Sequence, residues 1–289
     1  MSLVERIRAC HRCDWSHFRP FRIGNERVGW IKHAFAERLR GFPEVFVVEE
    51  EAVHLAPGLD GFWERSRAVE AVLRRLQEKD GMFAAWSGEE YPVSTAFYAK
   101  PLMRMERAAI PAFGIRAYGV HVNGYVMGRT GGDEDLHLWV ARRAKDKRTA
   151  PGKLDHIVAG GQPIGITLRD NLVKEGAEEA ALPESMMRSA RPVGVFAYAL
   201  ETEEGLRDDV LFNYDLRLPP DFVPRNTDGE VEEFFLWPVE RVQRALAQTD
   251  DFKFNVAPVK IDFLVRHGII GPEDPDYLDI LAALHAGGY

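Results

Sequence analysis

The chain has 289 residues, of which 46% are hydrophobic and 28% are charged, a composition typical of a globular protein with one large or two smaller domains. It carries 37 Lys and Arg against 45 Asp and Glu, a formal charge of −8, which argues against proteins that bind nucleic acids or anionic membranes. It lacks a long apolar run and an apolar signal-peptide segment, and its only cysteines are Cys10 and Cys13. We therefore expect a cytoplasmic protein without a disulfide framework.

Short apolar runs in the first hundred residues predict alternating strands and helices. We expect strands at Arg19 to Ile23, Glu26 to Ile31 and Val45 to Val48, with a helix from His33 to Arg40. A longer helix is predicted from a cap at Asp60 to a stop at Gly81, because its apolar residues recur every three or four positions. The three prolines between Tyr91 and Ala112 indicate a traverse between two units.

After Gly114 the pattern changes to longer strands and helices. The strand Ala117 to Gly128 either runs straight through or turns as a hairpin at Asn123-Gly124. A basic loop, Ala144 to Lys153, separates the next two strands. The further strands predicted are His137 to Arg142, Asp155 to Ala159, Pro192 to Thr202, Val210 to Leu216 and Glu233 to Leu236, and the helices are Thr167 to Ala181, Pro238 to Ala247, Pro258 to His267 and Tyr277 to His285. This order predicts an α/β layered domain over residues 113–289, preceded by a smaller α+β domain over residues 1–112.

The segment from Ala159 to Leu182 carries the clearest chemical pattern. Glu175, Glu178 and Glu179 share one face of the predicted helix, within an arc of about 100°. A solvated acidic face is the commoner explanation of such a cluster. The preceding Gly160-Gly161 alters the balance, because two glycines after a strand permit a tight turn and a close backbone approach. Carboxylates on one helix face are the ligands that Mg²⁺ or Mn²⁺ prefers.

The same helix carries a stripe that is suited to packing on a sheet. Leu168, Leu172 and Ala180 lie on this stripe, and the small residues Gly176 and Ala177 would let the helix sit close to the sheet.

The segment resembles the signature box of the Nudix hydrolases, G-x5-E-x7-R-E-U-x-E-E-x-G-U, where U is a bulky aliphatic residue. Gly160 takes the first position, Glu175 the lone glutamate, and Glu178 and Glu179 the pair. Four positions depart from the pattern: Ile166, Lys174, Gly176 and Ala181 stand where the box has glutamate, arginine, an aliphatic residue and glycine. The resemblance implies a Nudix α/β/α sandwich with a mixed sheet, and a metal-dependent diphosphatase whose metal ligands are Glu175, Glu178 and Glu179.

Further segments are similar to the Nudix subgroup related to the front half of fungal thiamine pyrophosphokinases. They read LWVARRAKDK, PGKLDHIVAGGQP, NLVKEGAEEA and DGEVEEFFLW. That resemblance implies thiamine diphosphate, or a damaged analogue such as oxythiamine diphosphate, as the substrate. The alternatives are a broader diphosphatase of nucleoside diphosphates, ADP-ribose or nucleotide sugars, and a non-catalytic module that senses a ligand. The partner would be this small molecule, with no nucleic acid and no membrane, and assembly as a homodimer stays open.

Three other groups are candidates with plainer alternatives. Glu230 is either a surface turn acid or, by the family resemblance, an extra catalytic carboxylate or general base. Arg142, Arg143 and Lys147 belong either to a solvated basic loop or to a clamp for the substrate's phosphates, beside the backbone of Gly160 and Gly161. Cys10 and Cys13 with His17 suggest half a zinc site, but a structural site normally needs four ligands, so ordinary thiols are favoured.

Overall fold

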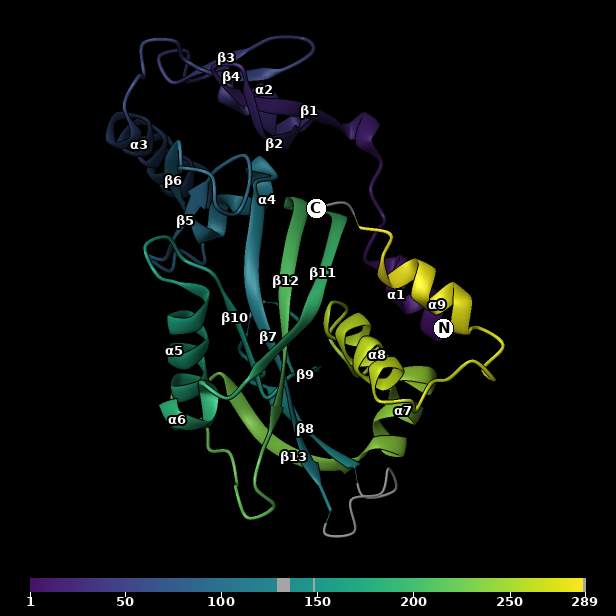
Figure 1. Ribbon diagram of the computed structural model, residues 1–289. Coiled ribbons are helices and arrows are strands. Elements are labelled where there is room, and N and C mark those ends of the chain that lie inside the picture. The colour runs from purple at the N-terminus through teal and green to yellow at the C-terminus, as the bar shows by residue number, and fades with distance from the viewer. Residues whose placement is uncertain (129–135, 148, 288–289) are drawn as a thin grey trace.

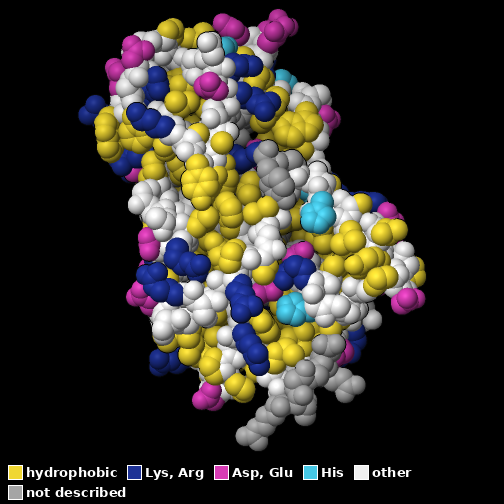
Figure 2. Space-filling view, viewed as in Figure 1, with side chains coloured by type: hydrophobic (Ala, Val, Ile, Leu, Met, Phe, Trp, Pro, Cys, Tyr) yellow, Lys and Arg dark blue, Asp and Glu magenta, His cyan; other side chains and the backbone are white. Residues whose placement is uncertain are grey.

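The computed structural model describes residues 1–128, 136–147 and 149–287 (Figure 1). The elements β1 to β6 with α2 to α4 (residues 18–113) form the upper part of the view, and a large sheet covered by helices, among them the first helix α1 (Leu3–Ala9), forms the lower part. Hydrophobic side chains gather on the surface where the two parts meet (Figure 2). Within the described residues, no helix combines the length and the apolar character needed to cross a membrane.

The first sheet has four strands in the order β2-β1-β4-β3. Its strands are β1 (Phe18–Ile23), β2 (Glu26–Lys32), β3 (Phe46–Val48) and β4 (Val53–Leu55). The predicted pair β1 and β2 is antiparallel, and its turn contains Gly24 at φ +59°, a conformation that glycine adopts without strain. Helix α2 (His33–Leu39) follows β2 as predicted and buries Phe35, Ala36 and Leu39.

The predicted long helix is α3 (Phe62–Asp80). It buries Val69, Val72 and Leu76 on one side, and Gly81 ends it in the left-handed conformation at φ +67°. The predicted cap at Asp60 is wrong, because the N-cap residue is Gly61, and no side chain caps this end of the helix.

The interpretation of residues 91–112 as a simple traverse is also wrong. Strands β5 (Glu90–Val93) and β6 (Met103–Glu106) pair as a two-stranded antiparallel sheet, followed by the 3-10 turn η2 (Arg107–Ala109) and helix α4 (Ile110–Phe113). Pro92 fits because β5 has a partner on one side only within the described sheet, so its missing N–H breaks no ladder.

The large sheet has the path β11-β12-β7-β8-β13, with β10 on β7 and β9 on β8. Its members are β7 (Arg116–Met127), β8 (Leu136–Arg143), β9 (Leu154–Asp155), β10 (Val158–Gly161), β11 (Arg191–Thr202), β12 (Gly205–Arg217) and β13 (Val231–Pro238). Strands β7 and β12 are parallel and the other pairs are antiparallel, so the sheet is mixed.

The hairpin option at Asn123-Gly124 is wrong, because β7 continues straight through it. Asn123 pairs with Asp215, and Gly124 with Leu216, in one unbroken parallel register. A side chain at 124 would collide with Ile157, since a Cβ there would lie 2.8 Å from its Cγ2. The glycine therefore serves packing rather than a turn.

Gly160 and Gly161 likewise lie in strand β10 and do not form the predicted tight turn. They pair with Val120 and Gly119 of β7. Neither has a positive φ. The other half of the prediction, a close approach to the glycine backbone, is met by side chains described below.

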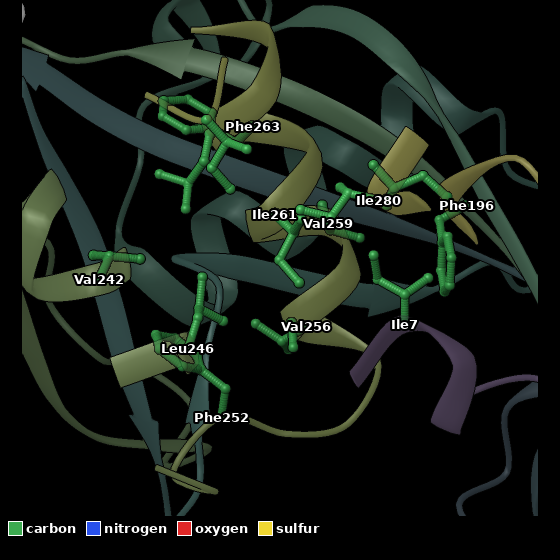
Figure 3. Close-up of a cluster of buried hydrophobic side chains, with 14 of the residues drawn as sticks. Ile7, Phe196, Val242, Leu246, Phe252, Val256, Val259, Ile261, Phe263 and Ile280 are labelled. Atoms are coloured by element: carbon green, nitrogen blue, oxygen red, sulfur yellow. The ribbon is translucent and has the colours of Figure 1, made fainter. Parts of the chain in front are cut away.

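Helices cover both faces of the large sheet, which confirms an α/β/α arrangement with a mixed sheet. On one face lie α5 (Leu168–Ala180) and α6 (Glu184–Met187), and on the other lie α1 (Leu3–Ala9), α7 (Val239–Gln248), α8 (Val256–Arg266) and α9 (Tyr277–Leu284) (Figure 1). Figure 3 shows Ile7 of α1 close to Phe196 of β11 and Ile280 of α9. The first helix of the chain thus packs with the last ones.

The hydrophobic cores do not divide at the predicted domain boundary, because Val4, Ile7 and Cys10 belong to a core of the large sheet. Phe113 and Ile115 are buried in the core of the N-terminal part, together with Phe21 and Phe46. Residues from Val120 onward contribute to the cores of the large sheet. The division at residues 112 and 113 stays a prediction, and the predicted boundary falls within α4.

Candidate functional site

Helix α5 is held in place at both ends and along its buried side. The hydroxyl of Thr167 accepts a hydrogen bond of 3.1 Å from the amide of Asp170, which caps the N-terminus. Leu172 and Ala180 are fully buried against the sheet. The small Gly176 makes room for Met187 of α6 and not for the sheet, since a Cβ there would lie 2.6 Å from its side chain. Ala177 is exposed, so its predicted role in close packing is wrong.

The three glutamates of α5 do not share one environment. Glu175 and Glu179 turn inward and are 9% and 8% exposed, whereas the side chain of Glu178 is 49% exposed. An oxygen of Glu179 accepts a 2.7 Å hydrogen bond from the amide of Ala159 in β10. Glu175 lies against Gly160, where a Cβ would come within 2.2 Å of its carboxyl carbon. Glycine at 160 therefore lets the carboxylate reach the strand.

Lys174 joins the inner and outer carboxylates. Its ammonium lies 3.1 Å from Glu175 Oε1 and 3.0 Å from Glu178 Oε2. It occupies the box position where the family pattern has arginine. The ammonium shows that the space between these two carboxylates attracts positive charge.

Burial and mutual repulsion make the inner carboxylates hard to ionise. Burial raises the pKa of Glu175, and Lys174 partly opposes that rise. Burial raises the pKa of Glu179 well above its usual range, the amide of Ala159 opposes this, and the charges of Glu175, Asp155 and Glu230 add to it. Several negative groups are thus gathered where a cation would stabilise them.

These residues fit a divalent cation by donor type. Carboxylate oxygens are the ligands that hard cations such as Mg²⁺ and Mn²⁺ take, and Lys174 already bridges two of the carboxylates as a cation. Among residues 1–128, 136–147 and 149–287, no three His, Cys, Asp or Glu side chains converge closely enough to hold a metal. Binding one would need Glu178 to turn from Lys174 toward the inner pair.

Glu230 lies in the loop before β13 and is held by the basic loop after β8. Its carboxylate pairs with Lys147 at 2.6 Å, and its carbonyl accepts from the amide of Ala144 at 2.9 Å. The charge of Glu230 contributes to the raised pKa of Glu179, so the two lie within electrostatic reach. Among the described residues, Glu230 makes no direct hydrogen bond to the inner carboxylates.

The two arginines predicted as a phosphate clamp already have partners in the fold. Arg143 donates to Asp155 at 2.8 Å and to the carbonyl of Thr149 at 3.1 Å, and its side chain is 13% exposed. Arg142 donates to the carbonyl of Gly152 and lies over the ring of Phe235. Both guanidinium groups therefore fix the loop after β8.

Three residues of the N-terminal part reach this site, and sequence reasoning missed them. The hydroxyl of Tyr91 lies against Gly161, only 1.5 Å from where a Cβ would stand. Glu89 and Arg107, which flank the β5–β6 pair, form an ion pair of 2.7 Å. The charge of Glu89 contributes to the raised pKa of Glu175. The available signal was Gly161 itself, because a glycine inside a strand marks a close approach.

The cysteines behave as ordinary thiols, as favoured from the sequence. Burial raises the pKa of Cys10 to about 12, and its thiol lies 3.4 Å from the carbonyl of Phe254. Burial also raises the pKa of Cys13 to about 11. Neither belongs to a metal-binding group within the described part of the chain.

Comparisons with known proteins agree with the box on α5. A family model described as a domain of unknown function, DUF4743, matches residues 2–117. The chain is 42% identical to Nudix hydrolase 24, chloroplastic, of Arabidopsis thaliana, over 98% of this chain and 78% of that protein. It is also 42% identical to Nudix hydrolase 20, chloroplastic, of the same plant, over 97% of this chain and 76% of that protein.

Among solved structures, the fold is similar to DR0079 from Deinococcus radiodurans. That match covers 60% of this chain and 98% of that one, with 20% identity and a TM-score of 0.45. The plant relatives carry the assignment, because their identity extends over both parts of the molecule. The chain belongs to the Nudix hydrolase family.

Proposed function

We propose that the protein is a Mg²⁺- or Mn²⁺-dependent diphosphatase that cleaves an organic diphosphate into a monophosphate and phosphate. The observation that carries this proposal is the inward position of Glu175 and Glu179, against the glycine strand β10. Two buried carboxyl groups of raised pKa, with Glu230 in electrostatic reach, form a centre in which a bound cation would stabilise the ionised forms. Such a centre favours a cation and, through it, an anionic substrate.

The protein's own residues divide the work in the following way. Glu178 and Glu179, together with Glu175, would hold the cation, which supplies neutralisation of the charge on the phosphate oxygens. The attacking water needs a proton acceptor, and a carboxylate of raised pKa such as Glu175 suits that role. Glu230 is the second candidate for the base. The amide of Ala159 holds Glu179 in orientation.

The favoured substrate is thiamine diphosphate or a damaged analogue such as oxythiamine diphosphate. This choice rests on the resemblance to the subgroup related to thiamine pyrophosphokinases. Oxythiamine has an oxo group where thiamine has an amino group, so one donor becomes an acceptor. A site that leaves a buried polar group unpaired against the wrong ligand loses about 1–3 kcal/mol. We expect the site to hydrolyse oxythiamine diphosphate faster.

A hydrolysis assay with Mg²⁺ and with Mn²⁺, in which substrate and products are separated chromatographically, tests the proposal, since ADP-ribose and nucleotide sugars would give two monophosphates and no free phosphate. The panel is thiamine diphosphate, oxythiamine diphosphate, ADP-ribose, a nucleotide sugar and a nucleoside diphosphate, compared by kcat/KM. A clear preference for ADP-ribose or the nucleotides would replace the thiamine substrate by the broader diphosphatase. Tight binding without turnover of any compound would instead identify a ligand-sensing module.

A further inference from the structure

The N-terminal part is fastened to the carboxylate site by two contacts of β5. Tyr91 packs on Gly161, as described above, and the amide of Ile164 donates a 2.8 Å hydrogen bond to the carbonyl of Glu90. Both contacts join β5 to the end of β10 and the loop that follows it. Residues beside β5 therefore have a fixed position relative to α5.

The backbone of Arg107 is hydrogen-bonded to the residue that precedes β5. Its amide donates to the carbonyl of Glu89 at 2.9 Å, and Nη1 donates to the Glu89 carboxylate at 2.7 Å. The preceding Glu106 is 4% exposed and accepts hydrogen bonds from the amides of Ser87, Gly88 and Ala108. The backbone that carries Arg107 is thus held firmly, while its side chain is 53% exposed.

Arg107 interacts electrostatically with groups at the carboxylate site. Its pKa is raised by Tyr91 and by the carboxylates of Glu89 and Glu230. Burial raises the pKa of Tyr91, the charge of Arg107 opposes that rise, and the charge of Glu175 adds to it. Arg107 thus lies beside β5, which contacts the end of β10 and the loop that follows it, and its partner Glu89 contributes to the raised pKa of Glu175.

The other basic side chains near the site are already engaged. Lys174 bridges two glutamates, Lys147 pairs with Glu230, and Arg143 pairs with Asp155 in a nearly buried position. Arg107 is half exposed, and its planar guanidinium fork pairs with Glu89 through the terminal nitrogen Nη1. Such a fork matches two oxygens of a phosphate group.

We propose that Arg107 is a substrate-binding residue of this site, whose guanidinium exchanges part of its pairing with Glu89 for a phosphate of the bound diphosphate. The inference rests on the proposed function for its substrate class. It assigns to the N-terminal part a role in recognition, because the positive group that an acidic site needs for an anionic substrate comes from there.

The chain offers a matched control in Arg104. It lies on the same β5–β6 pair and forms the same kind of ion pair, with Glu90 at 2.7 Å. Its guanidinium lies over the ring of Trp63 on α3, and it pairs with the carboxylate of Glu90, whose carbonyl makes the contact with Ile164. Arg104→Met therefore removes an equivalent charge and ion pair from the same β5–β6 pair without touching the proposed phosphate contact.

The test combines binding of a diphosphate probe with steady-state kinetics. Imidodiphosphate, a non-hydrolysable analogue of the diphosphate group, is titrated calorimetrically with Mg²⁺ into the full chain and into Arg107→Met, Arg107→Lys and Arg104→Met. We expect Arg107→Met to weaken probe binding and raise KM at least tenfold with kcat within threefold. Arg107→Lys should show a smaller loss of affinity, about half to two thirds of the loss in Arg107→Met on a logarithmic scale, since lysine keeps the charge but not the fork. Arg104→Met should stay within twofold of wild type.

The outcomes separate this inference from the proposed function. Wild-type turnover with an unchanged KM in Arg107→Met, or an equal effect of Arg104→Met, overturns the role of Arg107 and leaves the hydrolase standing. Arg107-dependent probe binding without turnover of any diphosphate supports the role of Arg107 and contradicts the hydrolysis. Failure of the wild-type chain to bind the probe at millimolar concentration overturns the inference as well.

Discussion

The two faces of the large sheet both bury ionisable side chains, but they do so in opposite ways. Under α5, Glu175 and Glu179 lie together, and Glu230 adds to the same negative field. Under α8, the fully buried Lys260 lies within electrostatic reach of Asp155 and Asp215, carboxylates of opposite sign. Like charges brought together make a centre that a cation would complete, whereas opposite charges compensate one another. Under the proposed function, the α5 face would hold the cation and is called the functional face, and the α8 face is called the structural one.

Compensation on the structural side is extensive. Asp215 accepts two hydrogen bonds from Arg266 and one from Asn123. Although burial alone would raise it, the positive charges of Lys253 and Arg143 hold the pKa of Asp155 well below its usual range. Lys260 is compensated only by charge at a distance, because its ammonium has no hydrogen-bond partner within the described residues.

The largest expected effect comes from breaking the compensated network. Arg143→Met leaves Asp155 with less positive charge in a buried position, which typically costs about 3–5 kcal/mol of unfolding free energy. Lys253 remains 3.6 Å away, so we expect the lower end of this range in urea denaturation. Arg142→Met is the control and should cost less, because among the described residues its guanidinium contacts a carbonyl and a ring and no carboxylate. If Arg143→Met kept the stability of the wild type and raised KM, Arg143 would instead be a phosphate-binding residue.

On the functional face, removing charge should harm catalysis and spare the fold. Glu179→Gln should lower kcat at least about 100-fold, the scale for losing one electrostatic stabiliser. Its melting temperature at pH 7 without metal should hold or rise, because a buried carboxylate that repels Glu175 is replaced by a neutral amide. Glu184→Gln, which breaks an exposed ion pair with Arg188 on α6, is the control for both measurements. More than half of wild-type turnover in Glu179→Gln would remove the metal assignment.

Lys260 gives a pH test of the comparison. Burial lowers its pKa from 10.5 to about 7, so the unfolded chain binds more protons there between these values. This lysine therefore makes stability rise with pH from about 7 to 10.5, and its full penalty is present below 7. Lys260→Met should raise the melting temperature at pH 6 and flatten the dependence between pH 7 and 9. A melting temperature that falls at pH 6 would show a bound partner for the ammonium instead.

The parts predicted correctly from the sequence are those that local patterns determine. Strands β7 and β11 and helix α5 lie within one residue of their predicted bounds, because hydrophobic periodicity and the cap at Thr167 are local signals, whereas β12 begins five residues before its predicted start. Glutamates at the spacing of the box identified the helix that faces β10. The spacing did not show that Glu178 turns outward, since its orientation depends on the pairing with Lys174.

The errors have a common physical cause, which is contact between segments far apart in the sequence. Gly124, Gly160 and Gly161 read as turn residues, yet each accommodates a distant side chain: Ile157, Glu175 and Tyr91. The β5–β6 pair was missed because Pro92 within β5 argued against a strand. A strand with a partner on one side only tolerates proline. The contribution of Arg107 follows from the packing of β5 on β10, which no local pattern encodes.

The smallest expected effect concerns the end of α5, the element that carries the functional carboxylates. Ala181 caps the helix in the left-handed conformation at φ +53°, at the position where the family box has glycine. A residue with a Cβ pays about 1–2 kcal/mol for that conformation, whereas glycine adopts it freely at some cost in unfolded-state entropy. We therefore expect Ala181→Gly to raise the unfolding free energy by up to about 1 kcal/mol.

The matched control is Ala177→Gly, in the exposed helical interior, which should lower the unfolding free energy by about 0.5–1 kcal/mol. Urea denaturation of both variants decides the matter: a loss of stability in Ala181→Gly as large as that in Ala177→Gly would mean that the end of α5 is not strained. Opposite signs would show that the helix carrying Glu175 and Glu179 ends under strain that packing of its buried face outweighs.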